Sequence, residues 1–304
     1  MSTPLASPRS SGITIAAALQ TARSRLEGLS ETARLDAEIL LARALNRDRS
    51  YLRAWPERKL SPDVEDRFHH LIERRQSGTP VAYLFGEKEF WSRTFRVSPD
   101  VLIPRPETEL LVELALAATP ASQTADILDL GTGSGAIAVT LAAERPAARV
   151  TATDLSPGAL NLAQENAVLH GVRNVRFRLG DWFDAVASDE QFDLIVSNPP
   201  YVADDDPHLN RGDVRFEPSL ALTGGLHGLD AFRIIAREAC DYLKPHGQLI
   251  LEHGFDQADS LADLLNEFGY AEISRHSDLQ GHFRVTTARW EPSSRSFSEQ
   301  KHAR

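Results

Sequence analysis

The sequence predicts an α/β protein, in which helices cover a mostly parallel β-sheet, preceded by a small helical domain. After residue 120, short runs of strand-forming residues alternate with helical patterns, as a parallel sheet requires. Before residue 79, apolar residues recur at helical spacing. The chain has 304 residues, of which 42% are hydrophobic, so it can bury a sizeable core.

The N-terminal segment, residues 1–12, is rich in serine and proline and is predicted to be disordered. Up to Leu26 the chain has arginines and serines but no acidic residue, which is also the composition of a mitochondrial transit peptide. An apolar stripe of helical period nevertheless runs from Ile15 to Leu29, and a helical bundle needs such a stripe. We therefore expect a retained segment and a cytoplasmic protein, with a mitochondrial location as the alternative for a eukaryotic chain.

Residues 13–78 are predicted to form the helical domain. Ser30 is placed as the N-cap of its second helix, and Ser61 precedes a proline that suits the first position of its last helix. The domain is interpreted as a substrate-recognition module, with simple packing as the alternative. Its helices are expected over residues 14–29, 31–45, 49–54 and 62–77.

A β-hairpin over residues 79–100 is expected to link the two domains, because aromatic and charged residues alternate around Gly86. Pro104 and Pro106 then enforce an extended segment, and Pro106 can start a helix that runs to about Ala118.

The sheet-containing domain is predicted over residues 101–290. Its last two strands should form an antiparallel pair at the end of the sheet. Residues 291–304 lack periodicity and are predicted to be disordered. The strands are expected near residues 125–130, 149–154, 174–179, 192–197, 247–252, 270–274 and 282–290.

A glycine loop follows the first predicted strand of the sheet. The sequence Asp-Leu-Gly-Thr-Gly-Ser-Gly (residues 129–135) opens a helix, and its glycines allow a ligand to approach the backbone closely. The spacing is G-x-G-x-G rather than the dinucleotide fingerprint G-x-G-x-x-G. The loop alone therefore does not identify the ligand.

Acidic residues end the next two predicted strands. Asp154 can accept hydrogen bonds from both ribose hydroxyls of a nucleoside. Asp181 suits the exocyclic amine of an adenine, and Trp182 suits its ring face. Acids at successive strand ends would repel a pyrophosphate and favour a ligand that carries a sulfonium cation. The pattern therefore favours S-adenosyl-L-methionine over NAD as the cofactor.

The strand predicted over residues 192–197 ends at Asn198-Pro199-Pro200-Tyr201, because proline cannot donate a ladder hydrogen bond. Ligands bind at this end of the strands in open α/β sheets. The Asn198 side-chain oxygen and the Pro199 carbonyl can accept both hydrogens of a planar NH₂ group, and Tyr201 can lie against its face. Taken alone, these four residues are equally consistent with an ordinary turn.

Composition excludes several classes of protein. The first 100 residues carry a net charge of +3 and the rest −13, which argues against a nonspecific binder of duplex DNA. No run approaches the roughly 20 apolar residues that cross a bilayer. Cys240, the single cysteine, excludes an internal disulfide and is interpreted as core filling. The histidines lack metal-binding spacing and the acids at residues 204–206 are interpreted as solvated, so no metal is predicted.

The glycine loop, the two strand-end acids with Trp182, and Asn-Pro-Pro-Tyr together resemble a class I methyltransferase that acts on a planar nitrogen. The Asn-Pro-Pro-Tyr signature is shared by adenine-N6 and glutamine-N5 enzymes. Three further stretches, with the N-terminal helices, resemble the PrmC/HemK family of peptide chain release factor glutamine-N5 methyltransferases. They are Pro-Val-Ala-Tyr-Leu-Phe-Gly (80–86), Ile-Pro-Arg-Pro-Glu-Thr-Glu (103–109) and Glu-Pro-Ser-Leu-Ala-Leu-Thr-Gly-Gly-Leu-His-Gly (217–228).

The resemblance covers about residues 13–290 and implies a Rossmann-like seven-stranded sheet. It implies methyl transfer from S-adenosyl-L-methionine to the glutamine of the Gly-Gly-Gln motif of class 1 release factors, which act in translation termination. Asn198, Pro199, Pro200 and Tyr201 are then expected to hold the glutamine, with Asn198, Pro199 and Tyr201 as the catalytic set. The residues expected at the cofactor are Gly131, Thr132, Gly133, Ser134, Gly135, Asp154, Asp181, Trp182 and Asn198.

Two other functions stay open at this point. An adenine-N6 methyltransferase would use the same Asn-Pro-Pro-Tyr, but the acidic balance of the chain counts against it. A noncatalytic nucleoside-binding module would not need Asp154, Asn198 and Tyr201 together. We expect a monomer without stable nucleic-acid or membrane binding.

Overall fold

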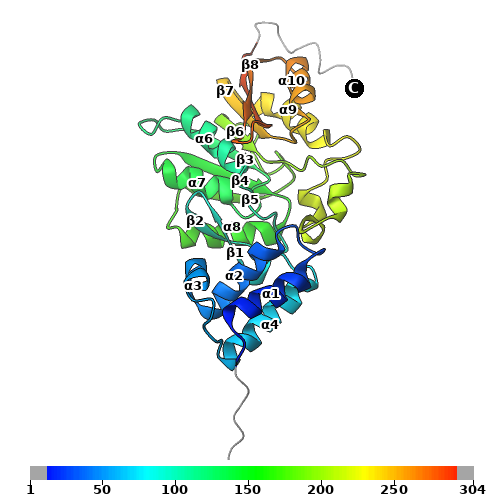
Figure 1. Cartoon of the computed structure of the whole chain (residues 1–304). Helices are drawn as coiled ribbons and strands as arrows, with labels where there is room; N and C mark the ends of the chain where they lie inside the picture. The colour runs from blue at the N-terminus through cyan, green and yellow to red at the C-terminus, as the bar shows by residue number, and fades with distance from the viewer. Residues whose placement is uncertain (1–11, 293–304) are drawn as a thin grey trace, which may run out of the picture. The chain divides into compact units, whose positions relative to one another are not determined.

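The computed structural model describes residues 12–292, which form two compact units. The disorder predicted for residues 1–12 and 291–304 lies almost wholly outside the described residues. The first unit holds the residues up to Phe85 together with Asn210–Phe216, and the second holds Gly86–Leu209 and the residues from Glu217 onward. A short segment from the second half of the chain thus belongs to the helical unit, which the sequence did not predict. Figure 1 shows both units.

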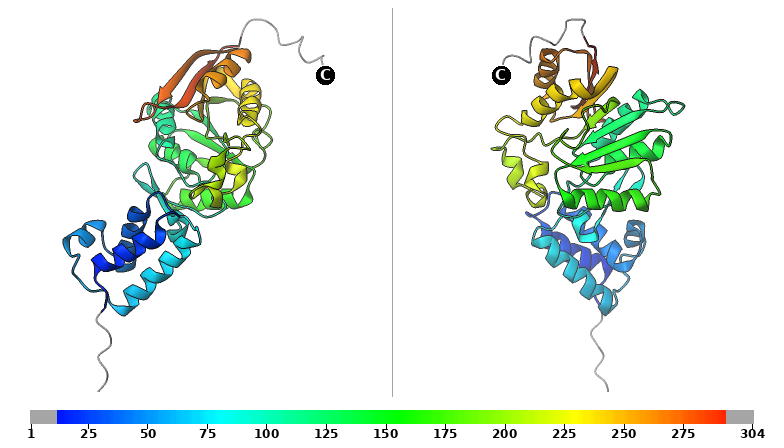
Figure 2. Two further views of the ribbon diagram at one scale, coloured as in Figure 1. Left: turned by 45° about the vertical axis from the view of Figure 1, so that its right-hand side comes forward. Right: turned by 180° about the vertical axis from the view of Figure 1, so that it is seen from behind.

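The helical unit contains α1 (Ile15–Leu26), α2 (Ala33–Leu45), α3 (Arg49–Ala54), α4 (Pro62–Gln76) and α5 (Val81–Phe85). Helices α1, α2 and α4 pack side by side (Figure 2). The apolar stripe predicted for α1 faces this bundle, except that Leu29 lies beyond the helix and is exposed. The centre of the bundle is formed by the fully buried side chains Ile15, Leu26, Leu40, Leu41 and Ile72.

The second helix begins later than predicted, at Ala33 rather than directly after Ser30. The Ser30 hydroxyl donates to Asp36 Oδ2 at 2.8 Å, and the Thr32 hydroxyl donates to Asp36 Oδ1 at 2.9 Å. Both hydroxyls therefore bind a carboxylate in the first turn of the helix. Ser30 Oγ also accepts the Thr32 N–H at 3.1 Å, so Ser30 caps backbone as predicted, although the regular helix begins only at Ala33.

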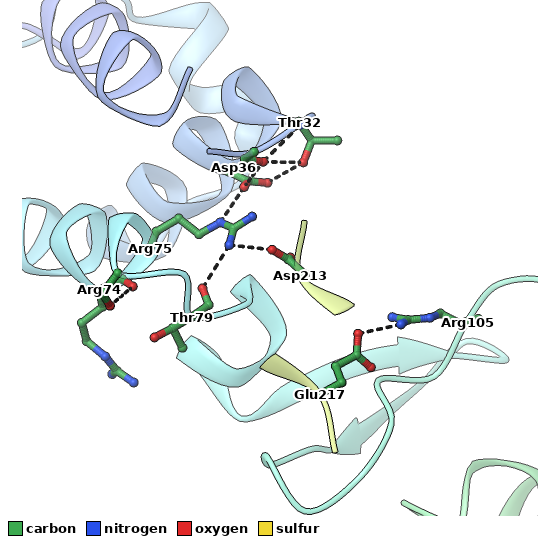
Figure 3. A network of polar contacts seen from close by, with 10 residues as sticks. Thr32, Asp36, Arg74, Arg75, Thr79, Arg105, Asp213 and Glu217 are labelled. Carbon is green, nitrogen blue, oxygen red and sulfur yellow. Dashed lines mark hydrogen bonds and ion pairs between the residues drawn. The ribbon is translucent and has the colours of Figure 1, made fainter. Parts of the chain in front are cut away.

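A buried arginine joins α4 to α2 and to the Asn210–Phe216 segment within the helical unit (Figure 3). Arg75 is 4% exposed; its Nε donates to Asp36 Oδ2 at 2.8 Å, and its Nη1 lies 2.7 Å from Asp213 Oδ1. Nearby, a Cβ atom on Gly78 would lie within the Phe216 ring, so only glycine fits there. The segment is therefore held by an ion pair and by close packing.

The predicted hairpin is shorter than expected. Residues 81–85 form α5, and the hairpin consists of β1 (Glu87–Phe90) and β2 (Arg93–Arg96). Trp91 and Ser92 at its tip both have positive φ, as a two-residue hairpin turn of type I′ requires. Phe90 and Phe95 are fully buried in the core of the second unit, so the hairpin belongs to that unit.

The second unit is built on a seven-stranded sheet in the order β5-β4-β3-β6-β7-β9-β8. The first five strands of this order are parallel, and β9 is antiparallel to both β7 and β8, as predicted for the end of the sheet. The strands are β3 (Asp126–Leu130), β4 (Arg149–Asp154), β5 (Val175–Leu179), β6 (Phe192–Ser197), β7 (Leu243–Glu252), β8 (Tyr270–Ser277) and β9 (Phe283–Trp290).

Helices cover both faces of this sheet because alternate strand residues are apolar on each face. One core joins the sheet to α6 (Thr108–Ala118), α7 (Ala136–Glu144) and α8 (Pro157–Leu169). The other joins it to α9 (Asp230–Tyr242) and α10 (Ala258–Glu267). The connection from β6 to α9 contains the short 3₁₀ helices η1 (Pro207–Asn210), η2 (Val214–Phe216) and η3 (Ser219–Ala221).

No helix among residues 12–292 is long and apolar enough to span a membrane.

Candidate active site

The glycine loop joins β3 to α7 at the carboxyl edge of the sheet. Gly131, Gly133 and Gly135 all have positive φ, between +55° and +79°, which other residues adopt only with strain. A Cβ atom on Gly135 would also lie 3.0 Å from the Cβ of Ala163 in α8. The N–H groups of Gly131 and Thr132 donate to the carbonyl of Thr153, at 3.0 and 2.9 Å. The loop is therefore fixed to the end of β4.

Asp154, the last residue of β4, ties the glycine loop to the start of α8. Its Oδ2 accepts from the Gly133 N–H and its Oδ1 from the Ser156 N–H, both at 2.8 Å. Burial raises the pKa of this carboxyl, and the backbone hydrogen bonds oppose that rise. Each carboxylate oxygen has a further lone pair, so Asp154 can still accept from a ligand hydroxyl.

Trp182 flanks the glycine loop from the next strand end. Its ring lies 3.6 Å from the position that a Cβ atom on Gly131 would take. Its carbonyl accepts a hydrogen bond from the Thr153 hydroxyl at 3.1 Å, which fixes a backbone with the unusual φ of +43°. Asp181 beside it is exposed. Trp182 and Asp181 therefore lie next to each other, the arrangement that the sequence predicted for an adenine site.

These residues line one cavity of about 500 Å³ in the second unit, a size usual for small-molecule sites. Of the predicted cofactor residues only Gly135 does not line it, because that residue packs against α8. Asn198 and Pro200 line the same cavity, whereas Pro199 and Tyr201 do not. Its walls are completed by apolar side chains, among them Leu102, Ile137, Leu155 and Leu220.

Asn198 reaches this cavity because β6 pairs with β3. Leu130 and Ser197 are register partners, and the Ser197 hydroxyl donates to the Leu130 carbonyl at 2.8 Å. The glycine loop and Asn198 therefore leave neighbouring strands at the same level. The Asn198 Nδ2 donates to the hydroxyl of Thr108, the first residue of α6, at 3.2 Å.

Tyr201 lies behind the cavity rather than on its wall. Its ring packs against the core on the side of α9 and α10, and its hydroxyl donates to Glu252 Oε1 at 3.4 Å. Burial raises the pKa of this phenol. Its carbonyl accepts from Gln257 Nε2 at 3.0 Å. Stacking of Tyr201 on a substrate amide stays a prediction, since the structure gives this side chain a supporting position.

Glu252, the last residue of β7, contacts Tyr201 of the Asn-Pro-Pro-Tyr stretch and was not predicted from the sequence. The side chain is 1% exposed, and among the described residues its Oε2 has no hydrogen-bond partner. Burial raises its pKa to about 7, against the effect of hydrogen bonding from Thr108 and Tyr201. An acid at the carboxyl end of a strand is the same signal that identified Asp154, and it could have identified Glu252.

The glycines of residues 217–228 have a structural explanation. A Cβ atom on Gly224 would lie 2.5 Å from the Pro200 carbonyl oxygen, and one on Gly228 would lie 2.2 Å from the Tyr201 carbonyl oxygen. Only glycine therefore allows this segment to pass so close to Asn-Pro-Pro-Tyr.

Glu217 joins the segment of residues 217–228 to the segment of residues 103–109. This buried carboxylate accepts from the Ile103 N–H at 3.0 Å and from Arg105 Nη2 at 2.6 Å (Figure 3). Arg105 itself lines the cavity. Neither Arg105 nor Glu217 was predicted to have a role of its own, because the two residues are 112 positions apart in the chain.

No group of three or more potential metal ligands occurs among residues 12–292. Cys240 packs against the core on α9 with its Sγ near the Tyr270 hydroxyl, and burial raises its pKa to about 11. A thiol in this state is a poor nucleophile.

Two family models match the chain, one for each unit. Residues 17–86 match the family described as "PrmC N-terminal domain", and residues 121–292 match a family described as "Methyltransferase domain". In fold, the chain is similar to a methyltransferase from Pyrococcus furiosus, with a TM-score of 0.51 and 19% identity over 72% of this chain and 97% of that one.

Relatives at higher identity extend over nearly the whole chain. A "Release factor glutamine methyltransferase" of Shewanella oneidensis is 49% identical over 91% of this chain and 96% of its own length. Proteins of the same name are 46% identical in Vibrio cholerae, over 91% of this chain and 97% of their own length, and 49% identical in Pseudomonas aeruginosa, over 86% and 94%. The chain therefore belongs to the release factor glutamine methyltransferase family.

Proposed function

We propose that this protein transfers a methyl group from S-adenosyl-L-methionine to the side-chain amide nitrogen of the glutamine in the Gly-Gly-Gln motif of class 1 peptide chain release factors. The observation that carries the proposal is that Asn198 shares one cavity with the glycine loop, Asp154 and Trp182. Relatives with the same name, at 46–49% identity over nearly their full length, support the choice of substrate.

The cavity fits S-adenosyl-L-methionine. Asp154 can accept from the ribose hydroxyls, and Trp182 can lie against the adenine, with Asp181 near the exocyclic amine. The predominantly apolar lining suits the remainder of the ligand, and the acidic residues suit its positive charge. When bound, the cofactor supplies an electrophilic methyl group on a sulfonium.

The protein's own contribution is to hold a weak nucleophile in place. A carboxamide nitrogen reacts poorly because its lone pair is delocalised into the carbonyl. The Asn198 Oδ1 atom and the Pro199 carbonyl can each accept a hydrogen bond from one of the two amide N–H groups. These bonds would direct the nitrogen toward the methyl group. Positioning of this kind can supply roughly 7–11 kcal/mol. The reaction therefore needs no strong base before methyl transfer.

A direct test is the transfer of labelled methyl from S-adenosyl-L-methionine to a purified class 1 release factor, with duplex DNA offered in parallel. We expect label on the release factor, and none when its Gly-Gly-Gln glutamine is changed to glutamate, because a carboxylate has no N–H to donate. Sites built to bind a substrate N–H reject analogues without one by up to roughly 10⁴–10⁵-fold. Label on DNA instead would establish the adenine-N6 alternative.

The cofactor assignment has a separate test. Asp154→Ala should weaken binding of S-adenosylhomocysteine by roughly tenfold or more in calorimetry, since hydrogen bonds to a charged group are lost. A folded variant with unchanged affinity, or a wild-type protein that binds NAD and not S-adenosylhomocysteine, would show that the cavity is misassigned.

A further inference from the structure

Asn198 and Tyr201 take part in a polar network with Thr108, which also lines the cavity, and with the buried Glu252. The Asn198 Nδ2 donates to Thr108 Oγ1 at 3.2 Å, and the Tyr201 hydroxyl donates to Glu252 Oε1 at 3.4 Å. The Thr108 hydroxyl also lies close enough to the Glu252 carboxyl to oppose the effect of burial on its pKa. Glu252 thus connects to both ends of the Asn-Pro-Pro-Tyr stretch.

The hydrogen bond between Asn198 and Thr108 shows how the amide is turned. It runs from the Asn198 Nδ2 atom to Thr108 Oγ1, so the NH₂ end of the amide faces Thr108. With Nδ2 held in this way, Oδ1 is the end of the amide that remains for a substrate.

Burial of Glu252 indicates that the carboxyl has a purpose beyond packing. The residue is 1% exposed, and Oε2 has no hydrogen-bond partner in the part of the chain that the structure describes. A leucine or methionine would fill such a position without this cost in stability. Buried, incompletely satisfied carboxyls beside a cavity are characteristic of functional sites.

We propose that Thr108 and Glu252 are positioning residues, which hold the Asn198 amide with its NH₂ group on Thr108 and its oxygen toward the substrate. The proposal rests on the proposed transfer to a glutamine amide. Rotation of the Asn198 amide by 180° would place an NH₂ group against the substrate NH₂ group, donor against donor. The network excludes this orientation and so defines a site that selects a carboxamide nitrogen.

The first experiment compares Thr108→Val, which keeps the shape and removes the hydroxyl, with Thr108→Ser, which keeps the hydroxyl. Thr108→Val should lower kcat for methyl transfer to the release factor by about tenfold or more, the value of one hydrogen bond. Its KM for the release factor and its affinity for S-adenosylhomocysteine should be nearly unchanged. Thr108→Ser should restore most of the lost kcat.

Thr119→Val is the matched control. Thr119 follows α6, the helix that Thr108 begins, and it is equally buried; its hydroxyl donates to the Ala115 carbonyl at 2.7 Å. This variant also loses one buried hydroxyl, but far along the helix from Asn198. We expect it to retain wild-type kcat, and melting curves on both variants will compare their stability.

A double-mutant cycle tests whether Thr108 acts through Asn198. Under single-turnover conditions, Thr108→Val should lower the rate by less than about threefold when Asn198→Ala is already present, because no amide is left to orient. Glu252→Gln, which keeps an acceptor, should retain more activity than Glu252→Leu, which removes it. If Glu252→Leu does not fold, the Thr108 variants and the double-mutant cycle still test whether Thr108 orients the Asn198 amide.

Three results would overturn the inference. These are normal kcat in Thr108→Val, an equal loss in Thr108→Ser, and full additivity of Thr108→Val with Asn198→Ala. Failure of the proposed function would look different, since the wild-type protein itself would then not methylate the release factor.

Discussion

Asn198 is the residue on which the proposed chemistry depends most directly. Its side chain lies at the wall of the cavity, and its Nδ2 atom is already bound to Thr108. Its Oδ1 atom is therefore the part that can accept a proton of a substrate amide. The function of the whole site thus depends on the orientation of one small planar group.

We expect Asn198→Ala to lower methyl transfer by about 100-fold or more at saturating cofactor, as loss of a positioned hydrogen-bonding group in an active site does. Asn198→Asp should also perform poorly, because its charge replaces the neutral acceptor, although that charge would attract the sulfonium. Asn266→Ala, at an exposed position of α10, is the control and should be fully active. Near-normal turnover by a folded Asn198→Ala protein would contradict the role of Asn198.

Asp129, at the base of the glycine loop, makes stability depend on pH. Burial raises its pKa to about 7 from 3.8, although the Thr132 hydroxyl donates to its Oδ2 at 2.7 Å. Between these values the folded protein binds more protons than the unfolded chain. Stability therefore falls as pH rises through this window and remains lowered above it.

Asp129→Asn is uncharged at every pH and removes this contribution. The melting temperature of the wild-type protein should therefore fall relative to that of the variant as pH is raised from 5 to 8. Glu252, whose pKa is also raised to about 7, is present in both proteins and cancels in the difference. If the melting temperatures of the two proteins changed in parallel with pH, the pKa of Asp129 would not differ between the folded and unfolded states.

At the scale of elements, the Asn210–Phe216 segment shows how an ion pair determines which elements pack together. Arg75 is buried between Asp36 of α2 and Asp213 of this segment (Figure 3). A buried guanidinium requires its partners, and the partners require the guanidinium, because an uncompensated buried charge is strongly unfavourable. The segment therefore folds as part of the helical unit although its neighbours in sequence belong to the other unit.

Arg75→Ala should lower the free energy of unfolding by about 3 kcal/mol, because it leaves the buried Asp36 carboxylate without its cation. The adjacent Arg74 is exposed, and Arg74→Ala should change stability by less than about 0.5 kcal/mol. Urea unfolding followed by circular dichroism provides both values. Equal stability of the two variants would mean that the Arg75 network contributes nothing net.

At the scale of the whole molecule, the two units are proposed to divide recognition from chemistry. The glycine loop, Asp154, Trp182 and Asn198 all belong to the second unit. The helical unit supplies none of the cavity-lining residues among those that the structure describes. Its proposed role is to recognise the release factor as a folded protein.

A chain that begins at Val81 should therefore bind S-adenosylhomocysteine with nearly wild-type affinity and lose most transfer to an intact release factor. Calorimetry and labelled-methyl transfer measure the two properties on the same sample. Removal of residues before Val81 also removes the partners of Asn210–Phe216, among them Arg75, so circular dichroism must first establish that the shortened chain is folded. Full transfer by this chain would reduce the helical unit to a packing module.

Much of this architecture could be predicted from local sequence patterns. Periodicity placed the strands and the antiparallel end of the sheet, because the side-chain repeat of a strand depends on which faces are buried. Local signals were less reliable where side chains bind each other. Ser30 accepts the Thr32 N–H, but its hydroxyl also donates to Asp36 and the helix begins only at Ala33. Similarly, residues 81–85 were assigned to the predicted hairpin but form α5.

The sequence predicted methyl transfer and one cluster of candidate site residues, because the glycine loop, Asp154, Asp181-Trp182 and Asn198 each stand at the carboxyl end of a strand in a parallel sheet. The carboxyl ends of such strands meet at one edge, so local order implies proximity. The tertiary structure was needed to show that Tyr201 contacts Glu252, that Asn198 contacts Thr108, and that Arg75 pairs with Asp213. Those contacts join residues far apart in the chain, and their partners are set by packing and burial, which no local pattern encodes.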